Sequence, residues 1–340
     1  MEHRLAQCAR VGDNKETMNE AHARTIAVTG GSGLIGSHLL RRLREDGSSL
    51  RVLTRTPQPE ASGTQYILGD LGDAASLRNL VKGATVVVHL AGIAHTSLPT
   101  KENRLRARAI NVGGTQRLLE AAGDAGAGRV IVTSSAHVYA GQSGIGLNES
   151  SPTLGDSAYA EMKLAVEASA TDAWSNGLDV VVIRPCITYG PGVRFNLASL
   201  MKAICGGYYF HAGSVDPVRS FLSVDAAAAA IIHLFSTKDA SRTYNIADRE
   251  PVHLVEWVNG LADRMRVRRP HTLPMGVLRG TALLLSPAVA MGFPAPLSME
   301  SLNKLTTSFS LDVSALARTG FLWPSTTDEI LDQMVQASKQ

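Results

Sequence analysis

A tyrosine and a lysine stand four residues apart in a segment, 158–176, whose composition predicts a helix. Residues at this spacing lie on the same face of a helix, so the phenol of Tyr159 and the ammonium of Lys163 are expected to be neighbours. A free phenol has a pKa of about 10, and a nearby positive charge lowers that pKa. Tyr159 is therefore a candidate general acid or base, although the same spacing is also typical of an exposed Tyr/Lys pair.

A cluster of hydroxyl residues ends an apolar segment, 129–134, that is predicted to be a strand. The segment runs into Thr-Ser-Ser-Ala-His-Val-Tyr, from Thr133 to Tyr139. Ligands of a parallel sheet bind at the carboxyl ends of its strands, and hydride transfer to a carbonyl needs a donor beside the reacting oxygen. A hydroxyl of this cluster is therefore expected to share a pocket with Tyr159.

A glycine-rich turn, Thr-Gly-Gly-Ser-Gly-Leu-Ile-Gly, lies between the predicted strand 25–29 and the predicted helix 34–45. Glycines at such a turn let the backbone approach a pyrophosphate, whose charge the exposed amides and the helix N-terminus stabilise. The last glycine allows the helix to pack closely on the strand. The residues expected to contact a dinucleotide here are Gly30, Gly33, Leu34, Ile35 and Gly36.

Short β-branched segments alternate with longer helical segments over the first two thirds of the chain, as in βαβ units around a parallel sheet. Almost continuously apolar segments such as VVVHLA suit strands covered by helices on both faces. The predicted strands are 25–29, 50–54, 85–90, 129–134 and 179–184, and the predicted helices are 34–45, 74–81, 104–122 and 158–176. The predicted fold class is α/β, a Rossmann doubly wound parallel sheet with a smaller, mixed C-terminal substrate lobe.

The alternation becomes irregular after Tyr189, where glycine, proline and aromatic residues become more frequent. We therefore expect a dinucleotide-binding domain over 24–190, preceded by a flexible tail over 1–23. Segment 221–247 reads as a short strand and an alanine-rich helix, and is expected to return to that domain. The substrate-binding lobe is expected to comprise 191–220 and 248–340.

Seven short motifs follow one another along the chain. They are TGGSGLIG (29–36), GDLGD (69–73), HLAG (89–92), NVGGT (111–115), SSAHVY (134–139), YAEMK (159–163) and RPCITYGPG (184–192). In this order they resemble the motifs of the extended short-chain dehydrogenase/reductase superfamily, specifically its NAD-dependent epimerase/dehydratase family of nucleotide-sugar enzymes. The resemblance extends from Thr25 to Tyr244 and implies a nicotinamide dinucleotide as cofactor.

This resemblance implies a catalytic role for three residues. Ser135 corresponds to the hydroxyl that polarises the substrate, because it lies four residues before Tyr139 in the SSxxVY pattern. Tyr159 corresponds to the acid/base. Lys163 corresponds to the residue that lowers the pKa of this tyrosine and binds the nicotinamide ribose.

The resemblance also implies contacts with both ligands. The further residues expected at the cofactor are Asp70, near the adenine, Leu71, Leu90, Ala91, Gly92, Asn111, Tyr159, Lys163 and Pro185. The residues that the resemblance implies at the substrate are Ser135, Asn196 and Arg219, and His137 is expected there because it lies close to the presumed pocket. A guanidinium can bind phosphate through two hydrogen bonds, although a structural salt bridge is the alternative for Arg219. The alternatives are a helix cap for Asn196 and loop packing for His137.

The end of the second predicted strand bears on which dinucleotide is bound. NAD-specific folds usually place an acid about 20 residues beyond the glycine turn, where it accepts hydrogen bonds from the ribose hydroxyls. No Asp or Glu lies between Leu50 and Gln58, and Arg55 instead offers a guanidinium to a 2′-phosphate. NADP is therefore favoured over NAD. An epimerase that retains its cofactor would instead resemble NAD users. The alternative for Arg55 is a plain surface charge.

The expected reaction is oxidation or reduction at C4 of a UDP- or dTDP-linked hexose, by a 4-epimerase or a 4-ketoreductase. Enzymes of the family that dehydrate sugars resemble one another in carrying Asp-Glu after the hydroxyl residue, where this chain has Ala136 and His137. Dehydratase activity is therefore not expected. The alternatives are a reductase of hydroxysteroid- or flavonoid-like ketones and a non-catalytic cofactor-sensing or scaffold protein on the same fold.

Composition is that of an ordinary globular enzyme, with 44% hydrophobic and 19% charged residues and a formal net charge of +3. This balance predicts no nucleic-acid partner. The three cysteines form no CxxC pair and no histidine stands at metal-ligand spacing, so no metal is expected and a cytoplasmic location fits. The apolar segment 277–293 is interrupted by Arg279, Pro287 and two glycines, which argues against stable membrane insertion. Helices 104–122 and 158–176 resemble a dimer-forming face of the superfamily, so a homodimer is expected.

Overall fold

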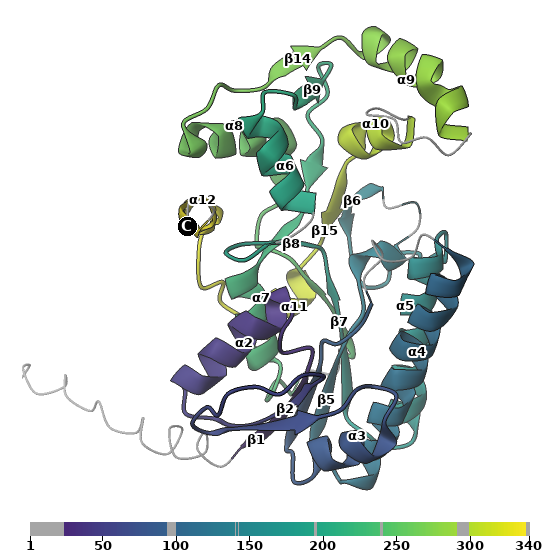
Figure 1. Cartoon of the computed structure of the whole chain (residues 1–340), viewed down its shortest axis with the longest axis vertical. Coiled ribbons are helices and arrows are strands. Elements are labelled where there is room, and N and C mark those ends of the chain that lie inside the picture. Colours follow the sequence, from purple (N-terminus) through teal and green to yellow (C-terminus); the bar gives the residue numbers. More distant parts are fainter. Residues whose placement is uncertain are drawn as a thin grey trace, which may run out of the picture.

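Seven parallel strands form the central sheet of the computed structural model (Figure 1). The structure describes residues 24–93, 100–139, 141, 143–193, 196–238, 241–290 and 299–337, and the predicted tail, 1–23, lies outside them. The strands, in spatial order, are β12 (Thr243–Ile246), β7 (Val180–Pro185), β5 (Arg129–Thr133), β4 (Val86–His89), β1 (Thr25–Thr29), β2 (Ser49–Thr54) and β3 (Thr64–Leu68). This order confirms the predicted Rossmann-type α/β fold.

The strand order reverses between β1 and β4, which are hydrogen-bonded neighbours. Their register places Thr29 opposite His89, so the two strands end side by side. In doubly wound sheets, ligands bind at the carboxyl ends of the strands at such a switch point. The fold therefore directs a ligand to the glycine turn that follows β1.

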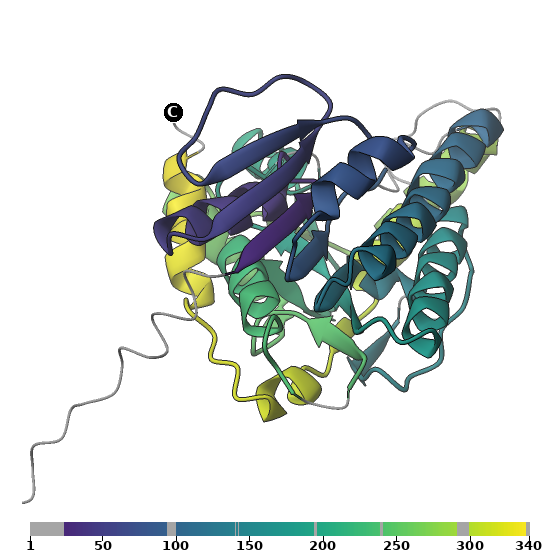
Figure 2. The ribbon, with the colours of Figure 1, turned by 90° about the horizontal axis from the view of Figure 1, so that it is seen from below.

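Helices cover both faces of this sheet (Figure 2). One face carries α2 (Leu34–Glu45) and α7 (Val224–His233), and the other carries α3 (Ala74–Val81), α4 (Lys101–Asp124) and α5 (Ala158–Ser175). The buried strand residues alternate between the faces, with Val88 in the core under α2 and α7 and Val87 in the core under the other three helices. Burial on both faces explains the continuous apolar composition of these strands.

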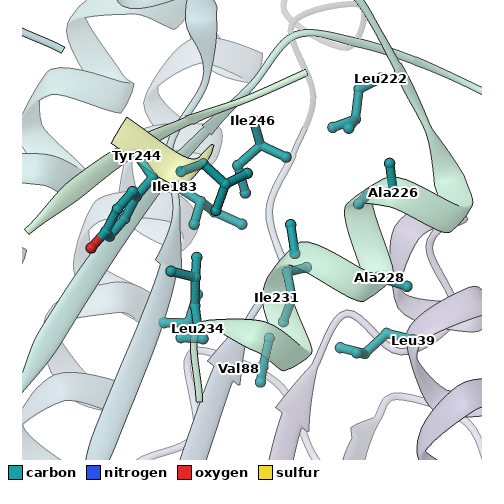
Figure 3. Packing of buried hydrophobic residues seen from close by; sticks show 14 of the residues in the cluster. Leu39, Val88, Ile183, Leu222, Ala226, Ala228, Ile231, Leu234, Tyr244 and Ile246 are labelled. Carbon is teal, nitrogen blue, oxygen red and sulfur yellow. The ribbon is translucent and has the colours of Figure 1, made fainter. Parts of the chain in front are cut away.

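The alanine-rich helix α7 packs on the sheet beside α2 (Figure 3). Its Ala226 and Ala228 are fully buried, and its Ile231 lies close to Val88 of the sheet. Small side chains allow the two helices to approach closely while Leu39 of α2 fills the space between them. Segment 221–247 thereby contributes α7 to one face of the sheet and β12 to its edge.

Smaller sheets and further helices lie beyond the carboxyl ends of the strands of the central sheet. The strands are β6 (Gly144–Leu147), β8 (Ile187–Tyr189), β9 (Phe210–Ala212), β10 (Val218–Arg219), β11 (Phe221–Ser223), β13 (Val252–His253), β14 (His271–Leu273) and β15 (Phe309–Leu311). The helices are η2 (Ala136–Val138), α6 (Asn196–Cys205), α8 (Leu254–Met265), α9 (Met275–Ala290), α10 (Met299–Thr306), α11 (Ser314–Arg318) and α12 (Thr327–Ala337). A second core lies between α6, α8 and α12, where Phe221 stacks on Trp257 with ring centroids 4.5 Å apart.

Part of the predicted substrate lobe packs into the first core. Leu311, Val313 and Leu316 are buried there, and the indole of Trp323 donates a hydrogen bond of 2.9 Å to the carbonyl of Ala247. The boundary at 248 therefore stays a prediction, because residues on both sides of it pack into the same core. Within the described residues, no helix is long and apolar enough to cross a membrane.

Candidate active site

The glycine turn after β1 has the backbone geometry that its composition predicts. Gly30 has a φ of +76°, and a Cβ at this residue would lie 2.5 Å from the amide nitrogen of Ala91. A Cβ at Gly36 would overlap the carbonyl oxygen of Gly30. Only glycine fits either position without displacing backbone. The turn and the loop after β4 therefore form a narrow cradle whose walls are backbone.

Helix α2 begins at this turn without a side-chain cap. Its N-cap residue is Gly33, which has no side chain to accept a hydrogen bond from the first amides of the helix. Those amides, which include that of Leu34 and Ile35, are the groups that bind a pyrophosphate in dinucleotide folds. The cradle and the helix end together fit the pyrophosphate of a dinucleotide.

A buried histidine, for which no role was predicted from the sequence, joins the ends of β1 and β4 to α4. His89 Nδ1 accepts from the hydroxyl of Thr29 at 2.7 Å, and Nε2 donates to the hydroxyl of Thr115 at 2.9 Å. This direction follows because the hydroxyl of Thr115 donates its own hydrogen bond to the carbonyl of Asn111. Burial, with a smaller effect of Lys163, lowers the pKa of His89 to about 3, so the ring is neutral. The signal in the sequence was a histidine at the end of an otherwise apolar strand.

Asn111 holds the loop that follows β4. Its Oδ1 accepts from the amide of Ile93 at 2.7 Å, and its Nδ2 donates to the carbonyl of the same residue at 2.9 Å. Nδ2 also lies 3.3 Å from the sulfur of Met162 on α5. The polar atoms of Asn111 thus bind protein and hold the loop after β4 at Ile93, and its contact with a cofactor stays a prediction.

Ser135, Tyr159 and Lys163 come together at the end of β5. Ser157 caps α5 by accepting from the amide of Ala160, and this starts the helix so that Tyr159 faces Ser135, with which it shares a hydrogen bond. Lys163, one turn later, donates to the carbonyl of Thr133 at 2.8 Å, with its Nζ 5.9 Å from the centroid of the Tyr159 ring. The three side chains therefore form one cluster.

His137 lies against the same cluster. Its Nδ1 is 3.2 Å from Ser135 Oγ, and its ring meets that of Tyr159 edge to face with centroids 5.7 Å apart. The short helix η2, capped by Ser135, places it there. The histidine is therefore next to both groups that would contact a substrate carbonyl.

The charge state of the cluster differs from the expectation. Burial raises the pKa of Tyr159, and its hydrogen bond with Ser135 opposes this only in part, so the predicted lowering by Lys163 does not prevail. Burial also lowers the pKa of Lys163 itself to about 8, against the opposing charge of Glu167. Lys163 does not lower the pKa of Tyr159 as predicted because its ammonium donates to a backbone carbonyl rather than to the phenol oxygen.

The other predicted site residues are spread around this cluster. Asp70 is exposed after β3 and accepts from the amide of Gly72, next to the buried Leu71. Pro185 ends β7, beside Ile246 of β12. Arg219 lies half-buried on β10, where burial lowers its pKa and the neighbouring Tyr209 opposes that shift. Asn196 starts α6, and its side chain lies outside the described residues.

Arg55 follows β2 and is exposed. Within the described ranges we find no hydrogen bond or ion pair of its side chain. We expect Arg55→Ala to abolish any preference for NADPH over NADH, because a charge-assisted bond to a 2′-phosphate is lost. Titration calorimetry with both dinucleotides measures this, and Arg78→Ala, which removes an exposed guanidinium from α3, is the control. Tighter binding of NADH than NADPH by the wild type would contradict the assignment.

Metal chemistry has no candidate in the part of the chain that the structure describes. There, no group of three or more His, Cys, Asp or Glu side chains is placed to hold a metal ion. The chemistry of the cluster is instead that of a phenol, a hydroxyl and an ammonium beside a dinucleotide cradle.

A glycine cradle at the switch point, next to a Ser/Tyr/Lys cluster, defines a Rossmann-type dinucleotide-binding enzyme. Residues 26–247 match the family model described as "NAD dependent epimerase/dehydratase family". The chain belongs to this family.

The relatives similar to this chain include a nucleotide-sugar epimerase and a hydroxysteroid dehydrogenase. The chain is 28% identical to the UDP-glucose 4-epimerase of Vibrio cholerae over 246 residues, 70% of this chain and 75% of that one. It is 29% identical to the 3 beta-hydroxysteroid dehydrogenase/Delta 5-->4-isomerase of Mycobacterium tuberculosis over 294 residues, 80% of this chain and 78% of that one. It is also similar to the solved structure of MoeE5 in complex with UDP-glucose and NAD, with a TM-score of 0.73, 27% identity and coverage of 93% and 98% of the two chains.

Proposed function

We propose that this enzyme transfers a hydride to or from C4 of a UDP- or dTDP-linked hexose, as a 4-ketoreductase or a 4-epimerase. The observation that carries the proposal is the hydrogen-bonded Ser135–Tyr159 pair, with Lys163 beside it, at the carboxyl end of β5. A bound NADP or NAD supplies the hydride or accepts it. The cradle of Gly30 and Gly36 supports dinucleotide binding, and the exposed Arg55 favours NADP.

Tyr159 handles the proton of the reacting C4 oxygen in this proposal. Because burial raises its pKa, the phenol is protonated at neutral pH and is ready to donate to a carbonyl oxygen. The hydroxyl of Ser135 donates a hydrogen bond to the same oxygen as negative charge develops on it. Lys163 stabilises the phenolate that remains and binds the ribose. A protonated phenol is the form that donates in the reductive direction, and the phenolate is the form that accepts in the oxidative direction.

Arg219, Asn196 and His137 are the proposed substrate contacts. Arg219 brings a half-buried positive charge to the lobe that follows the sheet, and such a charge suits a diphosphate. The ligands in the solved structure of MoeE5, UDP-glucose and NAD, support a nucleotide-sugar substrate. Association of two copies through α4 and α5, and a cytoplasmic location, remain predictions.

We expect Arg219→Ala to weaken UDP binding about 10- to 150-fold with little effect on the dinucleotide. The reason is that a hydrogen bond to a charged group is worth about 1.5 to 3 kcal/mol. Titration calorimetry with UDP, dTDP and NADPH measures both affinities. Arg249→Ala, in which a largely exposed guanidinium is removed, is the matched control. Equal UDP affinity in the wild type and Arg219→Ala would count against the nucleotide-sugar substrate.

The second candidate is a reductase of hydroxysteroid-like ketones. The observation that favours it is the similarity to the mycobacterial hydroxysteroid dehydrogenase, which covers more of the chain than the similarity to the epimerase. Both candidates use the same cluster of Tyr159, Ser135 and Lys163 and differ in the second lobe. Assays of NADPH oxidation with UDP-4-ketohexoses and with apolar ketones distinguish them. A protein that binds the dinucleotide but turns over neither class would support a cofactor-sensing or scaffold role instead.

A further inference from the structure

Three consecutive residues at the end of β5 each bind a different residue of α5. The α5 partners are four residues apart, so they lie one above the other on the helix face that meets β5. The pairs are Thr133 with Lys163, Ser134 with Glu167, and Ser135 with Tyr159. Two of these pairs belong to the proposed site, and the third, Ser134 with Glu167, has no role in it so far.

Glu167 is a carboxylate with charged and polar partners on two strands. Its side chain is 14% exposed, and that of Arg184, on β7, is 8% exposed. Arg184 donates two hydrogen bonds to it, from Nε at 2.9 Å and from Nη2 at 2.7 Å, and Ser134 donates a third. Paired guanidinium and carboxylate groups of this geometry hold each other in a fixed orientation. Glu167 therefore ties α5 to β5 and to β7 at once.

Arg184 extends this connection beyond the sheet. Its Nη1 lies 3.2 Å from the hydroxyl of Tyr139, which donates to Asn245 of β12. It also donates to the carbonyl of Glu149 at 3.2 Å. The Glu167–Arg184 pair thus joins the ends of three neighbouring strands, β5, β7 and β12, behind the helix that carries Tyr159.

Lys163 has charged and titratable groups around it on several elements. On its own helix these are Glu167, one turn beyond, and Tyr159, one turn before. The neutral His89 comes from β4, and the negative charge of Glu167 is itself paired with the guanidinium of Arg184 from β7. Glu167 is the negative charge in this set that acts on Lys163, and it raises the pKa of the lysine against the opposing effect of burial.

We propose that Glu167 is a positioning residue of the active site, which holds α5 against the ends of β5 and β7 and places a negative charge one helical turn from Lys163. The proposal rests on the proposed function in one respect, the need of Lys163 for its charge during turnover. Its first test, the titration of Lys163, does not depend on any substrate.

The decisive variant is Glu167→Gln, because its amide oxygen can still accept from Ser134 and from Nε of Arg184, while the charge and the acceptor for Nη2 of Arg184 are removed. Lysines labelled with ¹³C at Cε are titrated by NMR, and the Lys163 signal is assigned by its loss in Lys163→Met. We expect Glu167→Gln to lower the pKa of Lys163 by about one pH unit. Asp172→Asn, which removes an exposed carboxylate from the same helix, is expected to leave it unchanged.

Turnover supplies the second readout. We expect the loss of activity in Glu167→Gln relative to the wild type to be about tenfold larger above both lysine pKa values than well below them. Glu167→Asp, which keeps the charge on a shorter side chain, is expected to retain most of the wild-type pH profile. A purely structural role would instead give the same loss at every pH. An unchanged lysine titration in folded Glu167→Gln would overturn the proposal even if the true substrate is not a nucleotide sugar.

Removing the charge leaves the buried guanidinium of Arg184 without a negative charge beside it, which can prevent folding. In that case Ser134→Ala tests the positioning role, since it deletes one hydrogen bond to Glu167 and no charge. We then expect kcat to fall about 2- to 10-fold without a change in the affinity for the dinucleotide, as the loss of one such bond implies. Wild-type kcat in Ser134→Ala would overturn the proposal.

Discussion

Replacing Tyr159 by phenylalanine is expected to lower kcat about 100- to 10,000-fold, which is the usual cost of losing a general acid or base. The substitution removes one oxygen and keeps the ring, so the edge-to-face contact with His137 stays. The dinucleotide cradle at Gly30 and Gly36 is not touched. Binding of NADPH is therefore expected to stay close to that of the wild type. Turnover is followed by NADPH oxidation, and binding by titration calorimetry.

Tyr208→Phe is the control, because Tyr208 is 67% exposed and loses the same single oxygen. It is expected to have wild-type kcat. Near wild-type turnover of Tyr159→Phe on the preferred substrate would show that another group donates the proton. Loss of both turnover and NADPH binding would show that the phenol oxygen serves the cofactor site instead.

Replacing Lys163 by methionine is expected to reduce both kcat and dinucleotide affinity, each by tenfold or more, because one ammonium is assigned two tasks. Methionine fills the buried space but gives up the bond to the carbonyl of Thr133. Kinetics and calorimetry on the same preparation separate the two effects. Unchanged dinucleotide affinity would remove the ribose role. Lys82→Met, at an exposed lysine after α3, is the control.

The pH dependence of the wild type provides a further check on Lys163. Its pKa is about 8, so the ammonium is charged below this pH and neutral above it. Activity that needs the charge is expected to fall as the pH rises through about 8 in the profile of kcat/KM, which reports the free enzyme. This falling limb should be absent from the residual activity of Lys163→Met. A wild-type profile that is flat across this range would contradict the role of the charge.

Segments with strong local patterns were predicted closely. Helices α2 and α3 begin and end at the predicted residues, and the predicted strands of the sheet are present. Strand β3 was missed, because an edge strand with one buried residue, Ile67, lacks a continuous apolar pattern. Helix α4 starts earlier than predicted, since the hydroxyl of Thr100 caps a first turn of exposed polar residues that carries no periodic signal.

Local chemistry allowed the dinucleotide turn and the Tyr159/Lys163 pair to be predicted from the sequence. A turn of this kind needs glycine because of its backbone angles, and the spacing of four residues follows from helix geometry. These constraints act within a few residues and are therefore readable in order along the chain.

Tertiary structure alone decided the charge states and the supports of the site. The pKa values of Tyr159 and Lys163 depend on how deeply other elements bury them, and burial overrides the local effect that their spacing predicts. Likewise, the sequence shows Glu167 only as an acid on a predicted helix and Arg184 only as the first residue of a motif, and it predicts no contact between them. They become a buried pair only because α5 packs against β7, which is a long-range property of the fold.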